Sequence, residues 1–436
     1  RAYDGDLARI RLPDDTGLWP TVDVYIPTYN ESLEVVSDTV LSAQNLDYPA
    51  DKIRIYILDD GRRDSFEAFA KSAGVGYITR EDNQHAKAGN LNNALGQTDG
   101  ELICVFDCDH IPTAGFLQAT VGGFLDDAKL AMVQTPHYFY SQDPFERNLG
   151  VGEELPREGE LFYGPVQKGN DFWNATFFCG SCAVIRREAL DETDGFAVET
   201  VTEDAHTALR FQRKGWRTAF VSLPLAAGLA TERLSLHIGQ RARWARGMTQ
   251  ILRVDNPLFG RGLSLAQRLC YLNAMLHFQF ALPRVVFITA PLAYLLLGQN
   301  IIASSASMIF AYALPHLFHA IWTNSRLNGR FRYTFWGEIY ESVLCFHLIK
   351  PTLVTLWDPK KGSFNVTEKG GLLENSFFDI SAVRPHLVVA FLLALGLGSG
   401  LVRFYWNEYY AIERDVMLLN VFWAGFSLIT LLAAPN

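Results

Sequence analysis

Short apolar runs alternate with amphipathic stretches between about residues 22 and 231. The runs VDVYIP, IRIYIL, LICVF and LAMVQT are rich in β-branched side chains, which predicts strands. Apolar residues at helical spacing predict helices between them, at about 32–46, 65–73 and 114–125. Strands that alternate with helices indicate an α/β domain with a mostly parallel sheet covered on both faces.

The last third of the chain has a different pattern, in which apolar residues continue without a polar face. Four windows there are each about long enough to cross a hydrocarbon core of ~30 Å. Core helices of a large soluble protein can also be this apolar, but four such windows so close together favour membrane helices. Prolines in the first two windows are compatible with this, because neighbouring helices satisfy the freed backbone groups. The predicted membrane helices are 276–297, 301–322, 387–404 and 416–432.

Charge placement predicts the orientation of these helices. Residues 232–268, just before the first window, hold seven arginines against two acids. The connection at about 299–307 has no charge, and 405–415 holds three acids against one arginine. Because basic loops stay in the cytoplasm, the α/β domain should be cytoplasmic. The stretch 341–357 is amphipathic and contains Pro351, so we expect it to lie on the membrane surface.

Polar residues follow three of the predicted strands. Because ligands bind beyond the carboxyl ends of parallel strands, these residues should meet at one edge of the sheet. Asp is also common in plain turns, but three such turns at one edge indicate a site. The pair in FDCDH offers hard oxygen ligands of the kind that Mg²⁺ takes together with substrate phosphates. The residues are Thr28 and Glu31 after the first strand, Asp59 and Asp60 after the second, and Asp107 and Asp109 after the third.

Composition indicates which partners the protein can have and whether its cysteines are reduced. The net charge of −9 argues against nucleic acid as a partner. Cys179 and Cys182 have CxxC spacing but no second pair that would complete a zinc site, so we interpret them as reduced thiols. Residues 1–20 are polar and contain no signal peptide, and we expect a cytosolic lead-in from the interior of a longer protein.

Six motifs in order resemble those of the processive family-two glycosyltransferases: PTYNE, LDDG, HAKAGNLN, FDCDH, TED and QRARW. FFCGSCAVIRR and FNVTEKG narrow the resemblance to the catalytic subunits of bacterial cellulose synthases. It implies a GT-A-type fold in the cytoplasm, a multi-pass protein of the bacterial inner membrane, UDP-glucose as donor, Mg²⁺ and an inverting displacement. The predicted regions are a lead-in at 1–20, a glycosyltransferase domain with an interfacial helix at 21–260, two transmembrane helices at 261–323, an interfacial helix and gating loop at 324–384, and two transmembrane helices at 385–436.

The resemblance also implies roles for residues on the donor side. Thr28, Glu31, Asp59 and Asp60 would hold the uridine end, and we count Asp60 with the catalytic residues because its loss should misplace the donor. Asp107 and Asp109 would bind Mg²⁺. Lys87 would lie near the nucleotide, although a lysine at a helix start is also an ordinary surface feature.

On the acceptor side, Asp204 in TED would be the general base that takes the proton of the attacking hydroxyl. By composition alone Glu203 is an equal candidate, and acids in a first helical turn are also plain capping residues. Cys179 would line the acceptor site through its shape.

The remaining motifs would act between the donor and the membrane. Gln240, Arg243 and Trp244 would contact the diphosphate and the chain end, although a helix on the membrane surface would favour the same residues. Thr367 and Lys369 would lie near the phosphates in a loop that closes over the nucleotide, a plain linker being the alternative.

Together with the predicted membrane helices, the resemblance implies a β-1,4-glucan synthase that passes its growing glucan chain through its own membrane helices. The resemblance further implies contact with membrane lipid and a periplasmic, membrane-anchored partner subunit. Two alternatives stay open: a synthase of hyaluronan, chitin, β-1,3-glucan or mannan, and a non-catalytic polysaccharide exporter. Family members also carry earlier membrane helices and a PilZ domain for cyclic di-GMP, neither of which this sequence shows, so regulation by that nucleotide is not predicted.

Overall fold

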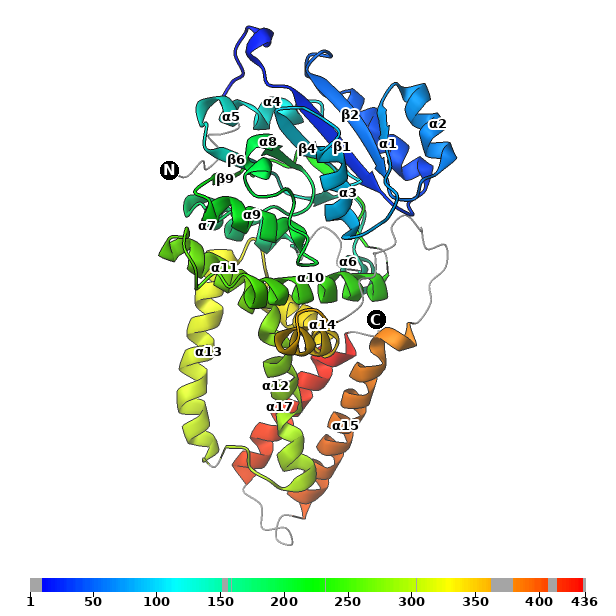
Figure 1. Cartoon of the computed structure of the whole chain (residues 1–436). Coiled ribbons are helices and arrows are strands. Elements are labelled where there is room, and N and C mark those ends of the chain that lie inside the picture. The colour runs from blue at the N-terminus through cyan, green and yellow to red at the C-terminus, as the bar shows by residue number, and fades with distance from the viewer. Residues whose placement is uncertain are drawn as a thin grey trace.

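The computed structural model describes residues 10–150, 156–157, 159–231, 233–302, 304–361, 379–406 and 414–433. An α/β domain lies at one end of the molecule and a group of long helices extends from it (Figure 1). The predicted loop with Thr367 and Lys369 lies outside the described residues, as do residues 1–9 of the predicted lead-in.

The main sheet of the α/β domain has seven strands in the order β3-β2-β1-β4-β8-β6-β9. Neighbouring strands are parallel except at β8, which is antiparallel to both β4 and β6. The predicted α/β fold with a mostly parallel sheet is therefore confirmed. The strands are β1 (Val22–Thr28), β2 (Ile53–Asp59), β3 (Gly76–Ile78), β4 (Leu102–Val105), β6 (Leu130–Gln134), β8 (Ala183–Arg186) and β9 (Arg217–Phe220).

Smaller elements complete the domain. A second sheet consists of β5 (Ile111–Pro112), β10 (Ala226–Gly228) and β7 (Tyr138–Phe139), in that order. The helix expected at 114–125 is divided in two at Val121, directly before Gly122 and Gly123, and glycine is a poor helix former. The helices are α1 (Leu33–Gln44), α2 (Asp64–Ala73), α3 (Ala86–Leu95), α4 (Phe116–Thr120), α5 (Gly122–Asp126), α6 (Pro144–Leu149), α7 (Gln167–Phe172), α8 (Arg187–Asp191) and α9 (Glu203–Arg213).

Two apolar cores lie on opposite faces of the sheet, as the alternation of side chains along a strand requires. Val24 and Ile26 of β1 pack in one cluster with α1, whereas Tyr25 belongs to the other cluster with α3 and α9. Every residue of β1 is buried, which explains why its sequence is almost continuously apolar.

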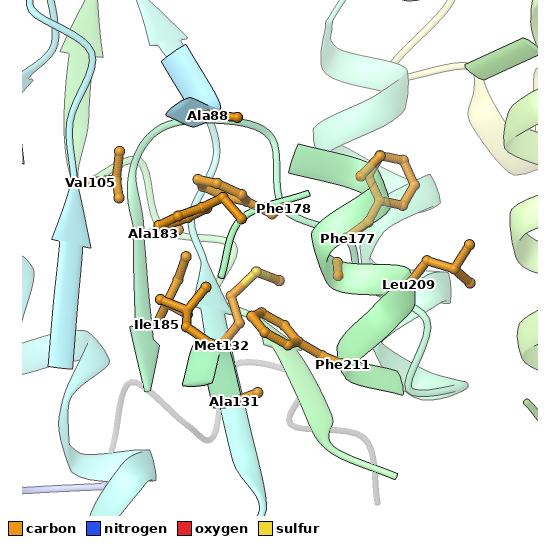
Figure 2. Packing of buried hydrophobic residues seen from close by; sticks show 14 of the residues in the cluster. Ala88, Val105, Ala131, Met132, Phe177, Phe178, Ala183, Ile185, Leu209 and Phe211 are labelled. Carbon is orange, nitrogen blue, oxygen red and sulfur yellow. The ribbon is translucent and has the colours of Figure 1, made fainter. Parts of the chain in front are cut away.

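The second core fixes the segment between α7 and β8. Phe177 and Phe178 pack with Met132, Ile185 and Phe211 (Figure 2). These two buried rings anchor the backbone directly before Cys179, so the FFCGS motif reaches the end of the sheet from a rigid base.

Long helices form the rest of the molecule. Helix α10 lies beneath the α/β domain, and α14 is seen along its axis just below it (Figure 1). Helices α12, α13, α15 and α17 extend away from the domain (Figure 1). The bounds are α10 (Leu234–Val254), α11 (Leu265–His277), α12 (Ala281–Leu297), α13 (Ala306–Asn328), α14 (Thr334–Trp357), α15 (Ile380–Tyr405) and α17 (Arg414–Leu432).

By length and composition, four helices of the described residues could cross a membrane: Leu265–Leu297, Thr334–Trp357, Ile380–Tyr405 and Arg414–Leu432. Three correspond to predicted membrane helices. The predicted membrane helix at 301–322 corresponds to α13, which is not among the four. The fourth candidate is instead α14, which contains the stretch 341–357 that we expected on the membrane surface. The arrangement in Figure 1 favours the original assignment, because α13 extends like α12 whereas α14 runs across the others.

Candidate active site

The predicted site residues of the first three strands lie at one edge of the sheet. In the parallel register, Thr28 pairs with Asp59 at the carboxyl ends of β1 and β2. Asp107 follows β4, which pairs with the other side of β1. Parallel strands therefore place these polar groups together, as the sequence pattern predicts.

Arg63 connects the ends of β1 and β2. Its guanidinium donates to the Asp59 carboxylate (2.8 Å), to Thr28 Oγ1 (3.0 Å) and to the Glu31 carbonyl (2.5 Å). Asp59 also accepts from Tyr77 Oη (2.9 Å) and is completely buried. Thr28 Oγ1 in turn donates to the Glu31 carboxylate (2.9 Å), so these residues form one hydrogen-bonded unit.

Asp60 has a separate partner. Arg80 Nε and Nη2 each donate to one oxygen of the Asp60 carboxylate at 2.6 Å. The same guanidinium donates to the carbonyls of Gln84 and Ala86, at the start of α3. Arg80 therefore joins the end of β2 to the HAKAGN segment, and this close approach needs Gly89, whose Cβ would lie 2.1 Å from the Gln84 carbonyl oxygen.

Lys87 lies between the donor-side acids and the predicted base. Its ammonium contacts the Asp107 carboxylate and donates to the Gly180 carbonyl (2.7 Å). A Cβ on Gly180 would lie 3.5 Å from Lys87 Nζ and 3.2 Å from Asp204 Oδ2. Gly180 has φ +88°, a conformation that favours glycine, so it lets Lys87 and Asp204 approach each other across the FFCGS segment.

Asp204 is in the first turn of α9 and has an unusual titration. Burial, followed by the neighbouring Glu203 carboxylate, raises its pKa from 3.8 to about 7. Lys87 and Arg243 oppose this shift, since positive charge favours the carboxylate. Burial also raises the pKa of Glu203. A carboxyl group with a pKa near neutrality is suited to accept a proton at physiological pH.

Asp107, Asp109 and His110 could hold a cation, because each offers one ligand atom within 4.8 Å of the others. Carboxylate oxygens suit hard divalent cations, so these residues fit a divalent metal ion. A second trio, His110, His137 and Cys182, is equally close but fits less well. Burial raises the pKa of the Cys182 thiol, and metals bind the thiolate.

One cavity of about 1750 Å³ connects these groups. Helix α10 contributes Gln240, Arg243 and Trp244 to its wall, with the Arg241 guanidinium 4.2 Å from the Trp244 ring centre. All predicted site residues that the structure describes line the cavity except Asp59 and Asp109, which lie behind the wall. Cys179 lines it too, with its backbone N–H bonded to Gln134 (2.8 Å) and its thiol pKa raised by burial.

The cavity continues past Asp204 towards the long helices. Its far wall carries aromatic side chains of α14 and of the segment before it: Phe331, Tyr333, Trp336 and Tyr340. Flat apolar rings suit the faces of sugar rings, which gives the cavity room and chemistry for a carbohydrate next to the acids.

Sequence reasoning missed Arg63 and Arg80, which hold Asp59 and Asp60. Arg63 could have been predicted as a partner of Asp59, because it lies four residues after Asp59 in LDDGRR. Arg80 carries no local signal, since its partner is 20 residues away. The aromatic wall was missed because its members come from the region 324–384, which we expected to form an interfacial helix and a gating loop.

Family models match most of the described fold. Residues 23–194 match the model of glycosyl transferase family 2, and residues 179–335 match the model of cellulose synthase. The two matches overlap over residues 179–194, which begin at Cys179 in the FFCGS motif.

Curated relatives are similar over nearly the whole chain. It is 59% identical over 429 residues to cellulose synthase 2 of Novacetimonas hansenii, covering 98% of this chain and 27% of the relative. It is 58% identical over 416 residues to the UDP-forming cellulose synthase catalytic subunit of Pseudomonas fluorescens, covering 95% and 56%. The chain therefore spans between about a quarter and just over half of these relatives.

A solved structure supports the fold. The mannosyltransferase PcManGT from Pyrobaculum calidifontis, in complex with GDP-Man and Mn²⁺, superposes with a TM-score of 0.56 at 20% identity. The match covers 82% of this chain and 94% of that one. The α/β domain thus has a GT-A-like glycosyltransferase fold.

Proposed function

We propose that the chain polymerises glucose from UDP-glucose into a β-1,4-glucan, because residues 23–194 match the model of glycosyl transferase family 2 and residues 179–335 match the model of cellulose synthase. The protein would be inserted in the bacterial inner membrane with its α/β domain in the cytoplasm. The glucan would leave through the long helices, and a periplasmic, membrane-anchored subunit would receive it. UDP-glucose and the glucan are carried over from the relatives, whose names describe cellulose synthases that form UDP.

The observation that carries this proposal is the proximity of Asp204 to Lys87 and Asp107 across Gly180, inside a cavity with a separate aromatic wall. A donor site alone would need the acids at the sheet edge. Asp204, which lines the same cavity as the aromatic wall and has a raised pKa, would supply the base for an acceptor hydroxyl.

In the reaction, the acceptor oxygen would attack C1 of the donor glucose while the bond from C1 to the diphosphate breaks. Asp204 would take the hydroxyl proton, and UDP would leave with the bonding electron pair. One displacement inverts the configuration at C1, so no second, nucleophilic carboxylate is needed. Lys87 and Arg243 would face the negative charge that develops on the diphosphate.

We propose that the divalent cation is Mg²⁺. Asp107 and Asp109 would hold it, and it would supply positive charge to the leaving diphosphate. The unit of Thr28, Glu31 and Arg63 would hold the uridine side, and Asp60 would keep the donor in place through Arg80 and α3. For Thr367 and Lys369, which lie outside the described residues, the role near the phosphates rests on the FNVTEKG motif alone.

Product analysis tests the proposal. Membranes that contain the protein should incorporate label from UDP-glucose, but not from other UDP-sugars offered singly, into a polymer that a β-1,4-endoglucanase digests. A polymer that resists this enzyme, or that forms from another sugar nucleotide, would show a different synthase.

The Asp204→Asn variant separates an enzyme from an exporter. It should lower synthesis by about 10²- to 10⁴-fold, the usual contribution of a general base. An exporter that only inherited the fold would transport polysaccharide equally well with this substitution.

A further inference from the structure

Large apolar side chains are exposed together where α7 meets the start of α11. Phe259 is 71% exposed and Leu265 is 72% exposed, which is unusual for side chains of this size outside an interface. Trp173 adds an aromatic ring directly after α7. We call this surface the α7–α11 shoulder; it consists of Phe172, Trp173, Leu258, Phe259, Leu265 and Leu269.

Hydrogen bonds hold the three parts of the shoulder in one place. Gln267 Nε2 on α11 donates to the Asn174 carbonyl (2.7 Å), which ties the turn after α7 to α11. Arg268 on α11 donates to the carbonyls of Pro257 (2.9 Å) and Gly260 (2.6 Å), which ties the loop with Phe259 to the same helix. These hydrogen bonds fix the backbone of the shoulder, so its segments do not fold over the exposed apolar side chains.

The shoulder is continuous with a segment that could cross the membrane. Helix α11 leads through η5 (Phe278–Phe280) into α12, and Leu265–Leu297 is one of the four candidate spans. In Figure 1, α7 lies just above α11, on the side of the molecule where α13 extends downwards. The shoulder therefore lies at the level where the α/β domain meets the long helices.

Exposed basic residues border the shoulder. Lys168 on α7, Arg253 at the end of α10 and Arg261 in the loop before α11 are all exposed. The acid in this loop, Asp255, is engaged by Arg213 (2.7 Å) and lies 3.4 Å from His206. Aromatic and apolar side chains bordered by basic groups match the boundary between anionic headgroups and acyl chains.

We propose that the α7–α11 shoulder is a lipid-contact surface, which seats the catalytic domain on the cytoplasmic leaflet beside the helical region. Trp173 and Phe259 lie in the headgroup region, and Lys168, Arg253 and Arg261 attract anionic lipids. This inference concerns the placement of the domain and does not depend on which sugar the enzyme transfers.

Photocrosslinking in the full protein tests the inference. A benzoylphenylalanine replaces Trp173, Phe259 or, as matched control, Leu41, which is also half-exposed but lies on α1, far from the long helices. The protein is reconstituted in nanodiscs of radiolabelled phosphatidylcholine, with or without phosphatidylglycerol. Positions 173 and 259 should crosslink to lipid at least tenfold more than position 41, and more strongly when the anionic lipid is present.

Other outcomes overturn the inference. Lipid crosslinking at 173 and 259 that stays at the level of position 41 would show that the shoulder faces water. A crosslinked protein dimer in place of lipid would identify the shoulder as a contact between two copies. Equal crosslinking with and without phosphatidylglycerol would contradict the claim that Lys168, Arg253 and Arg261 attract anionic lipids.

Discussion

At the scale of single residues, the site depends on carboxyl groups whose charge is controlled by burial. The folded chain raises the pKa of Asp204 from 3.8 to about 7, so between these values the folded state retains a proton that the unfolded state has lost. The corresponding stability is present below about pH 4 and is lost as the pH rises through 7. Ionisation of Asp204 near physiological pH therefore has a cost in folding free energy.

Asp204→Asn should thus stabilise the protein in a pH-dependent way. Without nucleotide or divalent ions, its melting temperature should exceed that of the native protein by more at pH 8 than at pH 5, because the amide is never ionised. Melting curves at the two pH values measure this, with Asp126→Asn at the exposed end of α5 as control. A difference that is the same at both values would contradict the raised pKa.

Lys87 competes with a cation for Asp107. Its ammonium contacts the Asp107 carboxylate, so it adds positive charge to the predicted cation site. Lys87→Met should tighten Mn²⁺ binding by about tenfold, a 1.4 kcal/mol change that is modest for a unit charge at this range. Isothermal titration calorimetry measures the dissociation constant. Asp107→Asn should weaken binding in the same assay, and a Lys87→Met variant with weaker binding would exclude competition.

At the scale of elements, the ends of β1 and β2 act as one unit because Arg63 bridges them. Arg63→Ala would leave the buried Asp59 carboxylate without its ion pair, at a cost of about 3 kcal/mol in stability. We also expect a KM for the donor at least tenfold higher with a smaller change in kcat, because Thr28 and Glu31 lose their support.

The matched control for this prediction is Arg54→Ala, at the opposite end of β2, whose ion pair with Asp99 is exposed. Arg63→Lys should recover little, since an ammonium does not reproduce the three-way fork. If Arg63→Ala lowers only the amount of folded enzyme and leaves KM unchanged, Arg63 stabilises the fold without shaping the site.

The same elements show what the sequence could predict. Thr28, Asp60 and Asp107 were predictable as neighbours, because parallel strands end at one edge whatever the details of packing. The burial of Asp59 behind the cavity wall could not be predicted, because it depends on the contacts that Tyr77 and Arg63 make with its carboxylate. Likewise, acids in TED indicate equally a cap or a base. Burial raises the pKa of both Glu203 and Asp204, and the approach of Asp204 to Gly180, which supports our choice of Asp204, appears only in the fold.

At the scale of the whole molecule, the direction of the chain through the membrane depends on α13 and α14. Helix α14 is apolar enough to cross a bilayer, but 44% of its most apolar window is buried in the protein. It packs against α10 and α12, and Arg284 on α12 donates to the Glu338 carbonyl and to Ser342 Oγ, both at 2.9 Å. Its hydropathy therefore reflects packing between helices, whereas only Ala306 of α13 is buried.

If α13 crosses the membrane and α14 lies on its cytoplasmic surface, Gly329 and Lys360 are on the same side. Cysteines introduced at these positions should both react with a membrane-impermeant maleimide only after the cells are opened, whereas one at Ser304 should react in intact spheroplasts. Labelling of the native protein is measured in parallel and subtracted, because it already contains six cysteines. A membrane-crossing α14 would instead separate Gly329 from Lys360. Because α14 and the segment before it supply the aromatic wall of the cavity that Asp204 also lines, this labelling pattern bears on the polymer path as well as on the topology.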